Sequence, residues 1–329
     1  MKVAILNYEG AVASSVAGPF DMLTKLQRIA QSLNVRSRVF FEVDIVNSTN
    51  LVVTDPFHMV GNLTINTRKR YDLIFIPAME FTLIEKTLQQ ETAMIKWVRR
   101  QYEQGADIAS ICLGAFVLGA TGLLDGKRAT THWMGATYLQ QLYPKVQVED
   151  GKVIIDEGRI YTSGAAFSFT SLVIYMIEKI CGTDMALAAS KVFMIQLHDS
   201  SQHAFSIFNL QRNHEDPDIS KAQDYIEKNY KEQLGISVLS KKLNMSARTF
   251  IRKFNSVTGN TVLEYIQRTR VEAAKRLLEK GKLTVEQVCM EVGYADFGFF
   301  RNIFKRITGL TPQEYKKKYN QMFNEAVVG

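Results

Sequence analysis

The chain has 329 residues, of which 46% are hydrophobic and 22% charged. This balance excludes a disordered protein, and the length favours two domains over one. No apolar run approaches the roughly 20 residues that span a membrane, so we expect a cytoplasmic protein with no membrane partner. Three cysteines, odd in number and far apart, suit neither a disulfide framework nor a metal site, and we expect no metal and no cofactor.

The net charge of +7 belongs entirely to the C-terminal third of the chain. Residues 1–215 carry 20 basic and 20 acidic side chains, whereas residues 216–329 carry 20 basic and 13 acidic ones. A basic unit joined to a neutral one is typical of proteins that bind a polyanion such as double-stranded DNA. A solvated, lysine-rich surface would produce the same asymmetry.

Residues 1–197 alternate short apolar runs with amphipathic stretches, which predicts an α/β domain with a mainly parallel sheet between helices. Segments 51–53 and 63–66 are predicted as a side hairpin or as edge strands. The predicted strands are Val3–Asn7, Val43–Asn47, Leu73–Pro77, Asp107–Ile111 and Arg159–Thr162. The predicted helices cover residues 16–33, 90–104, 113–121, 133–142, 166–181 and 184–197.

Residues 198–218 are polar, mixed in charge and closed by a proline, so we predict a linker there. Residues 219–329 show no strand pattern and are predicted to be all-α. The helices on either side of residue 270 either abut or form one long linking helix. The predicted helices cover residues 219–230, 236–243, 247–257, 261–268, 271–280, 285–292, 296–307 and 312–319.

The all-α part contains two predicted helix-turn-helix units. In the first, Ser246 is a good N-cap for a helix whose periodicity buries Phe250 and Phe254. In the second, Asp296 caps a helix that buries Phe300 and Phe304. Two such helices, held apart by a linking helix, could enter successive major-groove faces about 34 Å apart.

This duplication closely resembles the AraC-type DNA-binding domain over about residues 219–319. The resemblance rests on the segment 245–254, Thr258-Gly259, Gly293-Tyr294 and Thr308–Pro312. The usual proline is absent from residues 260–262, and a frequent Asn-Arg pair stands here as Arg301-Asn302. The residues expected at the DNA are Arg248, Ile251, Arg252, Gly298, Phe299, Arg301, Asn302 and Lys305.

Each expected contact has a plainer alternative. An exposed arginine can pair with guanine, but it can equally clamp a phosphate or stay solvated. For Phe299 we favour packing in the core over contact with a thymine methyl group. DNA binding through paired sites also favours a homodimer, with RNA polymerase as a further partner of an activator.

In the first domain, Cys112 lies at the corner between a predicted strand and a predicted helix, with Gly114 two residues later to close the turn tightly. Helix N–H groups at such a corner would lower the pKa of the thiol. His132 lies downstream and could approach it, giving the minimum pair for nucleophilic catalysis. A small buried cysteine with a core histidine is the alternative.

Residues 1–195 resemble the class I glutamine-amidotransferase-like superfamily, which implies a flavodoxin-like fold. The matching motifs are the corner at Cys112, Gly18–Asp21, Gly122–Gly126 and Ala129–Trp133. This domain followed by an AraC-type domain is the layout of the GlxA-like transcription regulators. The resemblance implies a DNA-binding regulator under small-molecule control.

Departures from the superfamily pattern favour a sensor over an enzyme. Ser15 stands where hydratase-like members carry an acid, and serine is no base at neutral pH. Residues 78–80 replace glycines that would shape an oxyanion hole, and Leu113 replaces a histidine. An active hydrolase or hydratase, or a redox sensor using Cys112, are the alternatives.

We expect the ligand pocket at the carboxyl ends of the parallel strands. Helix N–H groups there favour a carboxylate, and Glu80, if it faces inward, would pair with a cation. An amino acid, an amine or a betaine is therefore the expected effector. The expected lining residues are Ser15, Met79, Glu80, Cys112, Leu113 and His132.

Overall fold

The structure is a computed structural model, and it describes residues 1–32, 39–48, 61–195, 202, 208, 212 and 214–324. By contacts the chain divides into two compact units, Met1–Gln202 and His203–Gly329. The predicted segment 51–53 lies outside the described residues, as does most of the predicted linker. Among the described residues, no helix is both long enough and apolar enough to cross a bilayer.

The first unit is built on a seven-stranded sheet in the order β3-β2-β1-β4-β5-β9-β8. All neighbours are parallel except β8 and β9, as the strand–helix alternation predicts. Two further short strands form a separate parallel pair. The strands are β1 (Lys2–Asn7), β2 (Glu42–Asn47), β3 (Leu63–Thr64), β4 (Leu73–Ile76), β5 (Asp107–Ile111), β6 (Arg128–Ala129), β7 (Gln147–Val148), β8 (Ile154–Asp156) and β9 (Ile160–Ser163).

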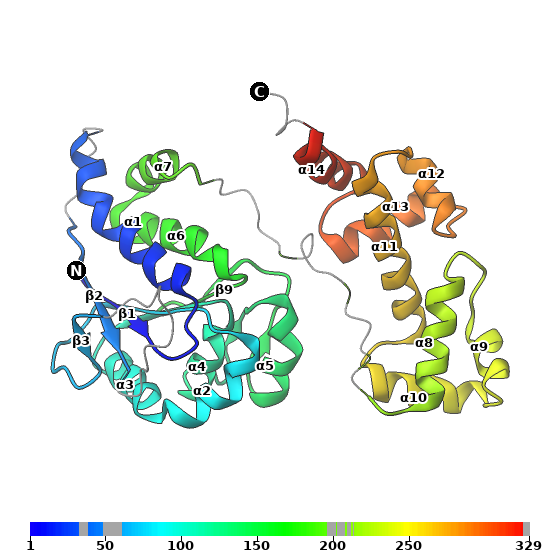
Figure 1. Cartoon of the computed structure of the whole chain (residues 1–329), viewed down its shortest axis with the longest axis horizontal. Coiled ribbons are helices and arrows are strands. Elements are labelled where there is room, and N and C mark those ends of the chain that lie inside the picture. Colours follow the sequence, from blue (N-terminus) through cyan, green and yellow to red (C-terminus); the bar gives the residue numbers. More distant parts are fainter. Residues whose placement is uncertain are drawn as a thin grey trace. The chain divides into compact units, whose positions relative to one another are not determined.

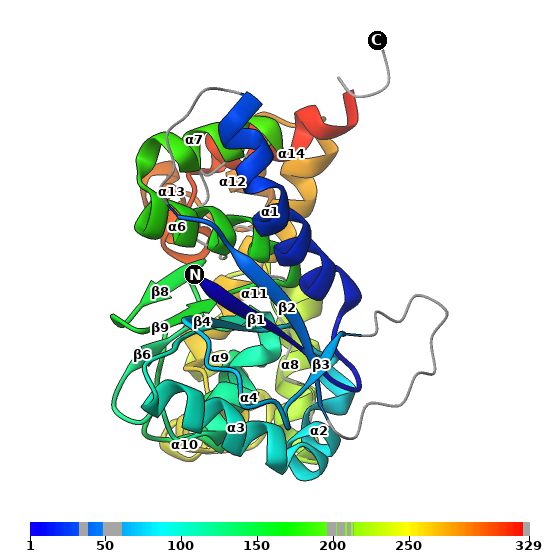
Figure 2. The same ribbon diagram turned by 90° about the vertical axis from the view of Figure 1, so that its left-hand side faces the viewer.

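Helices cover both faces of this sheet (Figures 1 and 2): α1, α6 and α7 lie on one face, and α2, α3, α4 and α5 on the other. Apart from the first residues of β1 and β5, Lys2 and Asp107, the central strands are buried because both faces are covered, which explains their continuous apolar runs. The helices are α1 (Ala13–Ser32), α2 (Ile84–Gln90), α3 (Thr92–Glu103), α4 (Ala115–Ala120), α5 (Ala136–Leu142), α6 (Phe169–Cys181) and α7 (Thr183–Val192).

The structure adds three details to the predicted elements of the first unit. The helix expected over 90–104 is confirmed as α3, whereas the short helix α2 that precedes it was not predicted. Of the two alternatives for segment 63–66, the structure has the edge strand: Leu63 and Thr64 pair in parallel with Val46 and Asn47 of β2. Strands β6, β7 and β8 were not predicted, since two or three residues give no usable periodicity.

The second unit is all-α, as predicted. It starts inside the segment expected to be linker, because Asp216 caps α8 and Pro217 is its first residue. The two segments around residue 270 form one helix, α11. The helices are α8 (Pro217–Asn229), α9 (Ile236–Lys242), α10 (Ala247–Thr258), α11 (Val262–Lys280), α12 (Val285–Glu291), α13 (Phe297–Thr308) and α14 (Pro312–Asn324).

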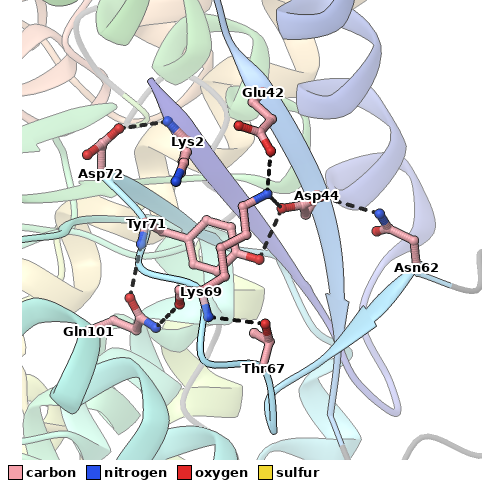
Figure 3. A network of polar contacts seen from close by, with 9 residues as sticks. All are labelled: Lys2, Glu42, Asp44, Asn62, Thr67, Lys69, Tyr71, Asp72 and Gln101. Atoms are coloured by element: carbon pink, nitrogen blue, oxygen red, sulfur yellow. Dashed lines mark hydrogen bonds and ion pairs between the residues drawn. The ribbon is translucent and has the colours of Figure 1, made fainter.

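A network of polar side chains fastens the amino end of β4 to β2 and α3 (Figure 3). Lys69 forms ion pairs with Asp44 and with Glu42, and the Tyr71 hydroxyl donates to Asp44 Oδ2 at 3.1 Å. From α3, Gln101 Nε2 donates to the Lys69 carbonyl and its Oε1 accepts from the Tyr71 N–H. This half-buried cluster holds the residues just before β4 against β2 and α3.

Candidate DNA-binding helices and the elbow at Cys112

The two helix-turn-helix units repeat each other with an offset of 50 residues from α10 onward. Phe254 and Tyr265 meet edge to face with ring centroids 5.4 Å apart, and Phe304 and Tyr315 meet with the same 5.4 Å separation. The polar contacts recur too, because Tyr265 donates to Glu227 and Tyr315 donates to Glu279. The repeat therefore extends from the sequence to the packing of each core.

Helix α10 presents a polar face to solvent. Ser246 caps it by accepting the Thr249 N–H at 3.2 Å, while Phe250 and Phe254 are fully buried. The opposite face leaves Arg248, Ile251 and Arg252 exposed. These are the positions that the periodicity assigned to the outside, and their contact with bases remains a prediction.

Helix α13 repeats this arrangement with different chemistry. Asp296 caps it through the Phe299 N–H at 2.6 Å. With the 50-residue offset, the exposed residue pairs are Arg248 with Gly298, Ile251 with Arg301, Arg252 with Asn302 and Asn255 with Lys305. Two equivalent surfaces that differ at all four positions are suited to two different base sequences.

The expectation that Phe299 packs in the core is wrong. Its side chain is 52% exposed, and its ring borders that of Tyr294 at a centroid distance of 6.0 Å. Thr249, one repeat earlier, is exposed as well. An exposed aromatic side chain on this face leaves contact with a thymine methyl group as a prediction.

Arg270 of α11 ties the two helix-turn-helix units together. Its Nε donates to the Tyr230 carbonyl at 2.8 Å, and its Nη2 donates to the Glu232 carbonyl at 2.7 Å. Its guanidinium also lies 4.9 Å from the Tyr294 ring centroid in the second turn. Sequence reasoning gave Arg270 no such role.

A second contact reinforces the first. Gly293 has a φ of +84°, and a Cβ there would lie 2.5 Å from the Lys231 carbonyl oxygen, so both the conformation and the space require glycine. A third contact lies between α13 and α11, where Arg306 Nη2 donates to Gln267 Oε1 at 2.6 Å. At 1.5 Å per residue, the 19 residues of α11 extend about 28 Å, close to one turn of DNA.

In the first unit, Cys112 occupies a strained corner between β5 and α4. Its φ is +54°, a left-handed conformation that costs a residue with a Cβ about 1–2 kcal/mol. The turn closes because Gly114 approaches β4: a Cβ at that position would lie 2.5 Å from the Pro77 carbonyl oxygen. The role predicted for Gly114 therefore comes from close packing, since its own φ is −57°.

Of the two alternatives for Cys112, its surroundings favour a small buried cysteine over an activated thiol. Burial raises the pKa of Cys112 to about 12, and the hydrogen bond from the Leu113 N–H offsets only part of this effect. The side chain is 5% exposed, and the helix that follows has only six residues. At neutral pH the sulfur is therefore a protonated thiol, a poor nucleophile.

His132 follows a residue that is hydrogen-bonded to the elbow, but its own imidazole forms no hydrogen bond with the thiol among the described residues. The preceding residue, Thr131, donates through Oγ1 to the Cys112 carbonyl at 2.8 Å. His132 Nδ1 accepts the Met134 N–H at 3.1 Å, and burial lowers the pKa of the imidazole. Among the described residues, no hydrogen bond joins His132 to Cys112 Sγ.

The remaining predicted pocket residues differ in their burial. Ser15 is buried and fully engaged with backbone, donating to the Val12 carbonyl and accepting the Ala78 N–H. Met79 and Leu113 are buried as well, whereas Glu80 is exposed, and its pairing with a cation stays a prediction. The Ala78 N–H, a candidate oxyanion donor, is thereby occupied.

Two buried side chains at this edge of the sheet were not predicted. Tyr8, directly after β1, donates to the Pro77 carbonyl at 2.7 Å. Burial raises the pKa of its hydroxyl, and the nearby ionisable groups of Cys112 and Glu91 raise it further. Glu91 accepts the Ser48 hydroxyl at 2.9 Å. The position of Tyr8 directly after β1 could have identified it, whereas Glu91 lies between two helices and gave no such signal.

Comparisons with known proteins agree with both units. Residues 1–179 match the DJ-1/PfpI family, and residues 239–318 match a helix-turn-helix domain. The chain is 26% identical over 224 residues to the HTH-type transcriptional regulator GlxA of Rhizobium meliloti, covering 67% of this chain and 68% of GlxA. It is 25% identical over 254 residues to the regulator CdhR of Pseudomonas aeruginosa, covering 75% and 72%.

A crystal structure of a Vibrio parahaemolyticus protein has the same fold as the first unit. It superposes with a TM-score of 0.51 at 18% identity, covering 58% of this chain and 98% of that one. The predicted fold and the predicted pairing of domains are therefore confirmed. The chain belongs to the DJ-1/PfpI family and joins this domain to a C-terminal helix-turn-helix domain of the AraC type.

Proposed function

We propose that the chain is a transcription regulator that binds specific DNA sequences through α10 and α13. The observation that carries this proposal is the 50-residue repeat, which gives both helices a buried aromatic face and an exposed polar face. The basic excess of the same unit supplies the attraction to phosphates. The relatives GlxA and CdhR, which bear the name of transcriptional regulators, support the assignment.

The first unit, Met1–Gln202, is the sensor of this regulator, and its effector is a small molecule such as an amino acid, an amine or a betaine. The high pKa of Cys112 and the engagement of Ser15 with backbone favour a binding domain over an enzyme. The regulator acts as a homodimer that contacts RNA polymerase, since paired sites strengthen binding.

The test is selection of DNA from a random duplex pool by the full-length chain, followed by binding measurements on the selected sequence. We expect a preferred site with two conserved blocks about one helical turn apart. Variants Arg252→Ala and Asn302→Ala should each lose preference in one block only. Recovery of no preferred sequence, or loss in both blocks from either variant, would contradict the proposal.

A second candidate function is cysteine-dependent hydrolysis or hydration, because the strained corner at Cys112 is the geometry of a nucleophile elbow. It is tested by assaying the full-length chain on amide, ester and isocyanide substrates beside Cys112→Ala. Turnover that disappears in Cys112→Ala would replace the sensor assignment. Thermal-shift screening with amino acids, amines and betaines tests the sensor directly.

A further inference from the structure

Gln202 is the last residue of the first unit, and its side chain is inserted into that unit. It is 4% exposed although it falls within the polar stretch that predicted a linker. Its backbone N–H donates to the Gly151 carbonyl at 2.8 Å. Its Nε2 lies 2.9 Å from the Thr131 carbonyl oxygen and 2.8 Å from that of Lys152.

Among the described residues, the groups that surround this amide are hydrogen-bond acceptors. Besides the two carbonyls, Nε2 lies 3.3 Å from the Asp150 carbonyl oxygen and 3.2 Å from Thr130 Oγ1. The Thr130 hydroxyl hydrogen points elsewhere, because Thr130 Oγ1 donates to the Lys152 carbonyl at 2.8 Å. A group held here must therefore supply N–H donors.

Glutamine fits this niche incompletely. Its Oε1 is buried and has no hydrogen-bond partner among the described residues. A buried acceptor without a donor is costly, whereas a primary ammonium group has three donors and no acceptor. The niche is also shaped around the side chain, since a Cβ on Gly164 would lie 2.2 Å from Gln202 Cδ.

The niche shares a wall with the elbow. Thr131, whose carbonyl accepts from Gln202, donates its hydroxyl to the Cys112 carbonyl at 2.8 Å. The next residue along the chain is His132. The residues that hold Gln202 are therefore continuous with the residues expected to line the effector pocket.

We propose that Gln202 is an internal plug, and that an effector bearing a primary ammonium group displaces it from the niche. Displacement releases Gln202, the last residue of the sensor unit, and this release is the change by which effector binding is transmitted. The inference rests on the proposed control by a small molecule and narrows its class. It favours an amino acid or a primary amine over a betaine, whose quaternary nitrogen has no N–H to donate.

The test is hydrogen–deuterium exchange of the full-length chain, read on peptides that cover residues 128–134. Gln202→Ala empties the niche, and Gly164→Ala evicts the amide without removing it. Both should exchange at least about tenfold faster at these residues, whereas Gln147→Ala, at an exposed glutamine on β7, should match the wild type. Methylammonium should restore protection in Gln202→Ala, and tetramethylammonium should not.

Unchanged exchange in Gln202→Ala, or equal protection by the two cations, would overturn the plug. If Gly164→Ala fails to fold, the wild type decides: methylammonium, and not tetramethylammonium, should accelerate exchange of the Gln202 amide. DNA binding is measured on the same samples with the selected duplex. If exchange at residues 128–134 does not respond while DNA binding is intact, the plug alone is rejected. If the wild-type chain does not bind the selected DNA, the proposed function is rejected.

Discussion

The guanidinium of Arg270 lies over the ring of Tyr294 while donating to two carbonyls at the end of α8, so a single side chain joins both helix-turn-helix units. Arg270→Ala removes two charge-assisted hydrogen bonds and leaves both carbonyls unpaired. We expect the second unit to lose about 2–3 kcal/mol of stability. Far-UV circular dichroism during thermal unfolding measures this loss.

The same variant should weaken DNA binding further than its stability loss explains, because the two recognition helices lose their fixed separation. Arg276→Ala, at an exposed arginine on the same helix, is the control and should change neither property by more than about 0.5 kcal/mol. DNA affinity equal to wild type in folded Arg270→Ala would show that the units orient themselves without this contact.

Arg252 is expected to contact a base, and its replacement separates base contact from phosphate contact. Arg252→Ala should weaken binding to the selected site by about five- to 150-fold, equivalent to about 1–3 kcal/mol, and relax preference at one base pair. Fluorescence anisotropy at several salt concentrations measures both effects. A uniform loss on all sequences, with a salt slope smaller by about one, would identify a phosphate contact instead. Lys221→Ala, on the exposed side of α8, serves as the control.

The faces of α10 and α13 could be predicted from sequence because a helix-turn-helix is local: caps and a 3.6-residue period decide which side is buried. The pKa of Cys112 could not, since it depends on distant segments that cover the elbow. Gln202 was missed for the same reason, because a polar residue in a polar stretch carries no signal of its burial. Helix α2 was missed because its seven residues are too few to show a clear helical period.

Cys112 should react slowly with alkylating reagents at neutral pH. Only the thiolate reacts, and burial raises the pKa of Cys112 to about 12. We expect its labelling rate to rise roughly tenfold per pH unit and to be still rising at pH 10, up to the limit of folding. Mass spectrometry of iodoacetamide-treated protein separates Cys112 from Cys181, which is partly exposed. Rapid labelling at pH 7 would revive the redox-sensing alternative.

The Asp44–Lys69 pair should make the first unit sensitive to acid. Burial would raise the pKa of Asp44, but hydrogen bonds from Lys69, Asn62 and Tyr71 outweigh it and lower the pKa. The stabilisation is therefore present above the unfolded-state pKa and is lost as the pH falls through the lower folded-state value. At pH 7, Asp44→Asn should cost about 3 kcal/mol, because it leaves Lys69 with only an exposed partner.

Urea unfolding followed by tryptophan fluorescence measures this cost, since Trp97 and Trp133 both lie in the first unit. The difference between wild type and Asp44→Asn should shrink as the pH falls toward 2. Glu42→Gln, which alters the exposed arm of the same network, should cost less than about 1 kcal/mol. A cost for Asp44→Asn that does not change with pH would place its origin in packing and not in charge.

Glu91 should have the opposite pH dependence. Burial raises its pKa, the Ser48 hydrogen bond lowers it, and the charge of Glu9 raises it further, so that the pKa in the folded protein is higher than in the unfolded chain. The folded state therefore holds this proton more tightly. The resulting stabilisation is complete below the unfolded-state pKa and is lost as the pH rises through the folded-state pKa.

Glu91→Gln removes this charge while keeping an acceptor for Ser48. Relative to wild type, the variant should therefore become more stable as the pH rises from the unfolded-state pKa to the folded-state pKa of Glu91, and the difference should then level off, as measured by the same fluorescence-detected unfolding. Glu103→Gln, at an exposed position of α3, should follow the wild-type curve at every pH. Parallel stability curves for the two glutamine variants would contradict this prediction. They would mean that Glu91 loses its proton as easily in the folded protein as in the unfolded chain.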